Sequence, residues 1–192
     1  MPANAIIIEW NANVDFPAFL AGFEQWAQAK EAQLAEASKM MTQVGNPGEY
    51  LLGLLVVALI PAIGEELLFR GVIQRQLEQY GINIHVAIWF SAIFFSLFHL
   101  QFYGFVPRML LGALFGYLFY WSGNLRIAML AHFVNNGFTL TLLYLYQLQS
   151  IEFNVEEPQS PSWPVALGAA SVCVFLLFVF YRHYQQQRLI SE

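Results

Sequence analysis

Residues 51–74 read LLGLLVVALIPAIGEELLFRGVIQ, an apolar stretch whose only charged residues are Glu65, Glu66 and Arg70. A run of about 20 apolar residues is long enough to cross the hydrocarbon core of a bilayer as a helix. A charge near the bilayer centre costs about 2.5–3.5 kcal/mol on insertion scales, so ionisable groups there face a polar cavity or pair with one another. The stretch therefore predicts a membrane-spanning helix that carries a functional site.

The composition of the whole chain is also that of a membrane protein. Of its 192 residues, 58% are hydrophobic and 11% are charged, and the mean hydropathy is +0.51. A soluble domain carries about 25% charged residues. The net charge of −5 argues against nucleic acid as a partner, because nucleic acid requires a basic surface. Cys173 is the single cysteine, which excludes an intrachain disulfide and a cysteine-based zinc site.

Apolar segments along the chain predict an all-α, polytopic transmembrane helical bundle with about five spans. The expected spans are 50–69, continuing as a helix to about 79, then 84–102, 107–121, 125–147 and 163–181.

Residues 16–43 alternate apolar side chains with Glu, Gln and Lys at helical spacing and are too polar to span. We expect them to form an amphipathic helix at the membrane surface or against the bundle, with a soluble linker helix as the alternative. The chain then divides into an N-terminal region (1–49), a transmembrane core (50–182) and a polar tail (183–192).

The orientation of the bundle follows from the positive-inside rule. If the C-terminus is cytoplasmic, most arginines fall on the cytoplasmic side, namely Arg75, Arg126, Arg182 and Arg188. Arg108 falls on the opposite side. We therefore predict a cytoplasmic C-terminus.

Polar side chains in three of the expected spans form a candidate site. Glu66 and Arg70 are four residues apart and can pair on one helix face, while Glu65 lies about 100° further round. A histidine ends the second span, and another, His132, shares a face of the fourth span with Asn136. A lone histidine in an apolar helix is more often a packed side chain, and a lone asparagine often an interhelical hydrogen-bonding group. Together with two carboxylates, they can bind a zinc-like metal or position a water for a carboxylate base.

Three motifs resemble those of the CPBP intramembrane proteases, the family of CAAX prenyl endopeptidases and bacteriocin-processing or immunity proteins. Residues 65–70 (EELLFR) match EExxxR, residues 95–99 (FSLFH) match FxxxH, and residues 132–136 (HFVNN) match HxxxN. The resemblance covers about residues 50–147 and implies an all-helical membrane fold with its site inside the membrane, near one face. Family members usually carry further helices before EExxxR. A short form and a piece of a longer protein therefore both remain open.

The resemblance also implies catalytic roles for Glu65, Glu66, Arg70, His99, His132 and Asn136. Glu65 would be the general base that activates water, and His99 would help to hold that water. The neighbouring ion pair would support the base, and His132 and Asn136 would stabilise the oxyanion. Both a metalloprotease and a metal-free, glutamate-dependent mechanism fit these residues. In the first case Glu65, His99 and His132 would bind Zn²⁺ or another divalent metal.

The main hypothesis is an intramembrane endopeptidase of the bacterial cytoplasmic membrane. Its partners would be membrane lipids and a membrane-associated or lipidated peptide substrate, with prenylated CAAX-type peptides as one class. One alternative is a non-catalytic scaffold or bacteriocin-immunity factor, which would have no need of complete motifs in an apolar environment. Another is a proton-coupled transporter component, in which buried carboxylates and histidines relay protons. No inverted repeat typical of transporters is visible.

Overall fold

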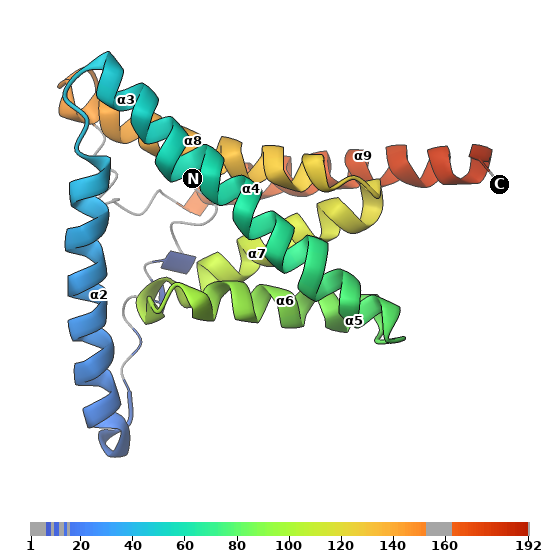
Figure 1. Cartoon of the computed structure of the whole chain (residues 1–192), viewed down its shortest axis with the longest axis horizontal. Helices are drawn as coiled ribbons and strands as arrows, with labels where there is room; N and C mark the ends of the chain where they lie inside the picture. The colour runs from blue at the N-terminus through green and yellow to red at the C-terminus, as the bar shows by residue number, and fades with distance from the viewer. Residues whose placement is uncertain (1–6, 9, 12–13, 15, 153–162, 192) are drawn as a thin grey trace.

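The computed structural model describes residues 7–191 apart from residues 9, 12–13, 15 and 153–162. The described residues form an all-α helical bundle (Figure 1). Four of its helices are long and apolar enough to cross a membrane, namely Pro47–Gln79, Phe102–Ser122, Leu125–Gln147 and Trp163–Gln187. The prediction of an integral, multi-pass membrane protein is therefore confirmed.

The first span is one continuous helix built from segments of different winding. They are α3 (Pro47–Gly53), η2 (Leu54–Leu59), α4 (Ile60–Glu66), η3 (Leu67–Gln74) and α5 (Arg75–Gln79). Asn46 caps the helix by accepting from the backbone N–H of Glu49, and Pro47 occupies its first turn, where proline is tolerated. Both η2 and η3 are π-helical, a rare winding that is frequent at functional sites. The two π-helical segments flank α4, which ends in Glu65 and Glu66.

The expected second span is shorter than predicted. Helix α6 (Ile84–Phe98) has 15 residues and is therefore about 22 Å long, against a hydrocarbon core of about 30 Å. It ends because Leu100 adopts a left-handed φ of 54°, which turns the chain into η4 (Phe102–Gly104). The turn leaves His99 at the end of the helix rather than inside a span.

The remaining helices are α7 (Phe105–Ser122), α8 (Leu125–Gln147) and α9 (Trp163–Ser191). Gly123 ends α7 with a left-handed φ of 64°, a conformation that glycine adopts without strain. The side chain of Asn124 then caps α8 by accepting from the N–H of Arg126. Leu177 and Phe180 of α9 pack against the core formed by α7 and α8. The short connection through Gly123 and Asn124 makes α7 and α8 neighbours.

Two glycines of α7 allow α6 to pack closely against it. A Cβ on Gly112 would lie 3.2 Å from the Cα of Ala92, and one on Gly116 would lie 2.9 Å from Cγ2 of Ile88. Such contacts are shorter than ordinary van der Waals packing. Gly112 and Gly116 are four residues apart on α7 and form a small-xxx-small pair, which serves helix packing.

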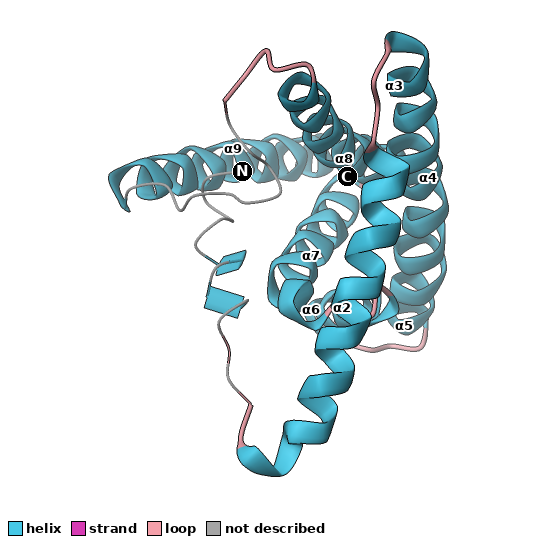
Figure 2. Cartoon of the chain, turned by 90° about the vertical axis from the view of Figure 1, so that its left-hand side faces the viewer, coloured by secondary structure: helices cyan, strands magenta, loops and turns pink. Residues whose placement is uncertain are grey.

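Helix α2 (Ala21–Thr42), preceded by η1 (Ala18–Leu20), lies across the end of the bundle where α3 and α7 begin (Figures 1 and 2). At one end, the ring of Phe23 contacts that of Phe102 edge-on at 5.0 Å. At the other end, the amide of Gln147 accepts from Val44 N–H (2.9 Å) and donates to the carbonyl of Thr42 (3.1 Å). The helix expected over 16–43 is therefore present, and it packs against the bundle. Its crosswise direction suits a helix at the membrane surface.

Candidate active site

The Glu66–Arg70 ion pair forms the buried base of the site. Arg70 Nη1 lies 2.9 Å from Glu66 Oε1, and both side chains have 0% exposure. Arg70 Nη2 also donates to the carbonyl of Gly112 at 2.5 Å. The guanidinium carbon lies 4.8 Å from the ring centroid of Phe95 and 5.6 Å from that of Phe115. A charge can remain buried here because acceptors and aromatic faces surround it.

Glu66 also orients His132 on α8. The Nδ1 atom of His132 lies 2.8 Å from Glu66 Oε1. Because a carboxylate only accepts, Nδ1 carries the hydrogen, and in the neutral ring Nε2 has a free lone pair. The ring of Phe115 stacks on the imidazole at 4.9 Å with an interplanar angle of 18°. The fully buried carboxylate and the aromatic ring thus fix both the plane and the tautomer of His132.

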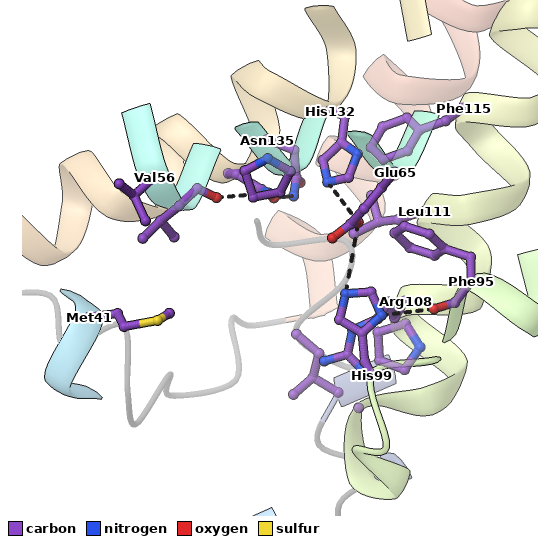
Figure 3. Close-up of a pocket in the computed structure, with 16 residues that line it drawn as sticks. Met41, Val56, Glu65, Phe95, His99, Arg108, Leu111, Phe115, His132 and Asn135 are labelled. Atoms are coloured by element: carbon purple, nitrogen blue, oxygen red, sulfur yellow. Dashed lines mark hydrogen bonds and ion pairs between the residues drawn. The ribbon is translucent and has the colours of Figure 1, made fainter. Parts of the chain in front are cut away.

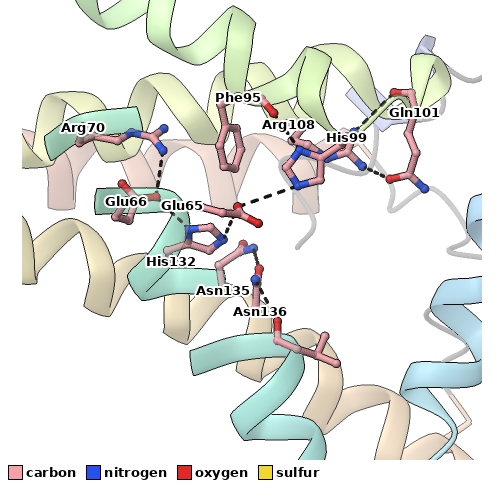
Figure 4. A network of polar contacts seen from close by, with 11 residues as sticks. Glu65, Glu66, Arg70, Phe95, His99, Gln101, Arg108, His132, Asn135 and Asn136 are labelled. Atoms are coloured by element: carbon pink, nitrogen blue, oxygen red, sulfur yellow. Dashed lines mark hydrogen bonds and ion pairs between the residues drawn. The ribbon is translucent and has the colours of Figure 1, made fainter. Parts of the chain in front are cut away.

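His99 is fixed in a comparable way at the end of α6. Its Nδ1 donates to the carbonyl of Phe95 at 2.8 Å, so its Nε2 also has a lone pair in the neutral ring. The Nε2 atoms of His99 and His132 lie 4.0 and 3.8 Å from Oε2 of Glu65. Figures 3 and 4 show the two imidazoles on either side of this carboxylate.

Glu65 differs from its neighbour Glu66 in having no fixed partner. Its side chain is 28% exposed, and its Oε2 atom is buried without a hydrogen bond to any described residue. Distances of 3.8–4.0 Å to the two imidazoles are too long for direct hydrogen bonds, and they suit a water that bridges the groups. The carboxylate is therefore placed to bind and polarise a water molecule.

A cavity of about 420 Å³ opens in front of Glu65 (Figure 3). One part of its wall is polar and comprises Glu65, His99, Arg108, His132, Asn135 and Asn136. The rest is largely apolar, with contributions from Val56, Leu111 and Phe115. Met41 of α2 and Ile8 also line the cavity. The cavity thus places an apolar surface beside the polar groups, as an amphiphilic ligand requires.

Asn136 lines this cavity and also joins two helices. Its Nδ2 donates to the carbonyl of Val57 at 3.4 Å. Pro61 has no N–H to offer the carbonyl four residues earlier, so the asparagine amide supplies a donor to Val57. Asn135 in turn donates to Asn136 Oδ1 at 3.1 Å. The interhelical hydrogen bond considered for Asn136 therefore exists, and it leaves the second hydrogen of the amide for another acceptor.

Residues 47–138 match the family model described as Type II CAAX prenyl endopeptidase Rce1-like. This segment is similar to that family. The Rce1-like segment runs from the start of α3 into α8 and contains the six residues named from the motifs, which confirms the resemblance.

A relative from Bacillus subtilis (strain 168), "Uncharacterized protein YpbD", is 29% identical over 85 residues, or 42% of this chain and 40% of that protein. The chain thus aligns with less than half the length of that relative. No solved structure matches the chain.

The sequence did not single out two of the polar residues in the Rce1-like site. Asn135 is adjacent to the motif asparagine, and nothing in the sequence distinguishes it. Arg108 could have been found from the sequence, because it is an arginine within the apolar stretch FVPRMLL. It also lies on the non-cytoplasmic side, where the positive-inside rule expects few arginines. Arg108 lines the same cavity as Glu65.

The donor set of the Rce1-like site is chemically suited to a divalent metal. Metal-bound histidines usually donate their second nitrogen to a carboxylate or carbonyl, as His99 and His132 do here. Glu65 would supply an oxygen ligand. Among the residues that the structure describes, no three His, Cys, Asp or Glu side chains are grouped closely enough to hold an ion. Binding would therefore require these side chains to draw together.

Proposed function

We propose that the Rce1-like segment is an intramembrane endopeptidase that hydrolyses a peptide bond of a membrane-associated substrate. The observation that carries this proposal is the unpartnered Oε2 atom of Glu65, which the Nε2 atoms of His99 and His132 face at 4.0 and 3.8 Å. A carboxylate between two oriented imidazoles in a partly apolar cavity is suited to act as a general base towards water.

The reaction would begin with a water held between Glu65 and the lone pair of His99. Glu65 takes one proton from this water while the water oxygen attacks the scissile carbonyl carbon. The free amide hydrogen of Asn136 then stabilises the oxyanion. His132 can also donate from Nε2 when it is protonated, with Glu66 as its counter-charge. Glu65 finally returns the proton to the leaving amine, which gives an amine and a carboxylic acid as products.

A divalent metal such as Zn²⁺ would be held by Glu65, His99 and His132, and it would polarise the water and the carbonyl. The steps above need only the protein's own side chains. Chelation followed by zinc add-back in the cleavage assay separates the two versions of the mechanism.

The apolar part of the cavity suits a lipid chain or a large apolar side chain on the substrate. The side chains of Val56, Leu111 and Phe115 lie close to the polar groups that would hold the scissile bond. Prenylated CAAX-type peptides join these two features in one molecule, so they are the first substrates to test. Unmodified apolar peptides are the comparison.

The proposed location is the bacterial cytoplasmic membrane with the C-terminus in the cytoplasm. Helix α5, the start of α8 and the end of α9 lie at the end of the bundle opposite α2 (Figure 1). These segments carry Arg75, Arg126 and Arg182. The positive-inside rule therefore assigns that end to the cytoplasm, and the α2 end to the other side.

The test is cleavage of fluorogenic peptides, prenylated and unmodified, by purified protein in liposomes. We expect cleavage by the wild type and loss by at least about 10²-fold in Glu65→Gln and His99→Ala, the usual scale for a general base. Glu78→Gln is the matched control, because Glu78 is exposed at the end of the same helix. No cleavage of any peptide by the wild type, with a cellular phenotype unchanged by Glu65→Gln, would instead support the non-catalytic scaffold.

A further inference from the structure

Arg108 of α7 is held beside His99 by hydrogen bonds to neutral groups. Its Nη2 donates to Gln101 Oε1 at 2.5 Å, and its Nη1 donates to the Gln101 carbonyl at 3.4 Å. Gly104, one turn earlier, leaves room for the guanidinium, because a Cβ there would lie 3.2 Å from Nη2. Figure 4 shows the guanidinium next to His99, with Glu65 on the other side of the imidazole. The position of Arg108 is thus defined, but the groups that hold it carry no negative charge.

Two carboxylates act on the charge of Arg108 from different helices. The charge of Glu31 on α2 has the larger effect, and that of Glu65 on α4 has the smaller one. No ion pair among the described residues includes Arg108, so the guanidinium is in direct contact with neither carboxylate. Its long side chain has several rotatable bonds and five N–H donors. A change of rotamer can therefore bring it towards either carboxylate.

Glu31 is placed as a counter-charge for Arg108. Its side chain is half-buried, and its Oε2 atom is buried without a hydrogen bond to any described residue. Burial raises the pKa of this carboxyl. The backbone N–H of Tyr103, the charge of Arg108 and the backbone N–H of Phe102 oppose that effect. Because burying a charge costs stability, the fold alone would favour a neutral side chain here, which indicates that the charge of Glu31 serves another purpose.

An ion pair between Arg108 and Glu65 would block the proposed reaction. Both side chains line the same cavity, and the Oε2 atom of Glu65 has no hydrogen bond to a described residue. The planar fork of a guanidinium pairs with a carboxylate in a bidentate, charge-assisted manner. Such a pair would fill the position of the water and make the carboxylate a weaker base. An active site with a free base therefore has to keep this arginine occupied elsewhere.

We propose that Glu31 is a positioning residue for the reaction, because its charge holds Arg108 beside His99 and keeps the guanidinium from pairing with Glu65. This inference rests on the proposed function, in which Glu65 is the general base. Helix α2 precedes residues 47–138, which match the family model. Met41 of the same helix lines the cavity. Helix α2 is thus a part of the active site and not only a helix at the membrane surface.

The peptide cleavage assay gives the first test. Glu31→Gln keeps the size of the side chain and an acceptor oxygen but removes the charge. We expect kcat to fall by at least about threefold with KM little changed, because the base is weakened or blocked. Glu31→Asp keeps the charge and should keep part of kcat, whereas Gly104→Ala should lower kcat by crowding the guanidinium. Glu36→Gln is the matched control, because Glu36 is exposed on the same helix and should keep the wild-type kcat.

A double-mutant cycle tests whether Glu31 acts through Arg108. In the Arg108→Gln protein no guanidinium is left to pair with Glu65, so adding Glu31→Gln should have no further effect on kcat. A helix that is needed only for folding would instead give losses that add in the double variant. Additive losses would overturn the proposal, as would a wild-type kcat in Glu31→Gln.

Unfolding in mixed micelles with SDS separates this proposal from the proposed function, because it needs no substrate. The coupling between Arg108 and Glu65 is measured with Arg108→Gln, Glu65→Gln and their double variant, first with Glu31 present and then in the Glu31→Gln protein. We expect a coupling of at least about fivefold in the unfolding equilibrium constant when Glu31 is replaced, and a smaller one when it is present. If no peptide is cleaved but this change is found, the protease assignment fails and the positioning of Arg108 by Glu31 stands. Equal coupling with and without Glu31 would overturn the proposal.

Discussion

Replacing Arg70 by methionine should destabilise the bundle by about 3–5 kcal/mol, the usual cost of removing one partner of a buried ion pair. Both Arg70 and Glu66 have 0% side-chain exposure. The Oε2 atom of Glu66 has no described partner, so the change would leave a buried carboxylate with only His132 to offset its charge. The hydrogen bond to Gly112 and the cation–π contacts would be lost as well.

The double variant Arg70→Met/Glu66→Gln tests the reason for this loss. Glutamine is close to glutamate in size and can still accept from His132 Nδ1, but it carries no charge. If the unpaired charge causes the loss, the double variant should be more stable than Arg70→Met alone by at least about 2 kcal/mol.

Unfolding in mixed micelles of increasing SDS fraction, followed by circular dichroism, measures these differences. Arg75→Met is the matched control, because Arg75 is exposed and its loss should change the unfolding free energy by less than about 0.5 kcal/mol. The reasoning is refuted if Arg70→Met is as stable as Arg75→Met. It is also refuted if the losses measured for Arg70→Met alone and for Glu66→Gln alone simply add in the double variant.

Three further changes give separate tests. Gly116→Ala should cost about 1–3 kcal/mol in the same unfolding assay, because the new Cβ would meet α6, whereas Gly168→Ala, with nothing within 4 Å, should not destabilise. Asn136→Ala should lower kcat by about 10²–10³-fold if its amide binds the oxyanion, with KM little changed; an unchanged kcat would contradict that role. Burial raises the pKa of Glu31 above 4.5, so its ionisation in the folded state is disfavoured and the unfolding free energy should fall as the pH rises above 4.5. Glu31→Gln should remove that part of the slope, and an identical slope in the variant would contradict the assignment.

The parts of the site that are local in sequence could be predicted from it. Glu66 and Arg70 are four residues apart, so helical geometry alone predicts their pairing, and the apolar surroundings predict their burial. Hydropathy likewise predicts the long spans, because about 20 apolar residues are needed for each.

The parts that depend on tertiary packing could not be predicted. His132 lies 66 residues from Glu66 in the chain, and no local pattern indicates that its Nδ1, rather than its Nε2, meets that carboxylate. The early end of α6 depends on the backbone of Leu100, a residue with no propensity for such a conformation. Arg108 reaches the cavity because Gly104 leaves space for it.

The central claim is that Glu65 activates a water for attack on a peptide bond. The most direct measurement is a digest in water enriched in oxygen-18, with the products identified by mass spectrometry for wild type and Glu65→Gln in the same lipid. The account predicts a new C-terminal carboxylate that carries one oxygen-18 atom in the wild-type digest, and no product from Glu65→Gln above the uncatalysed background. Labelled product formed by Glu65→Gln at the wild-type rate would contradict it.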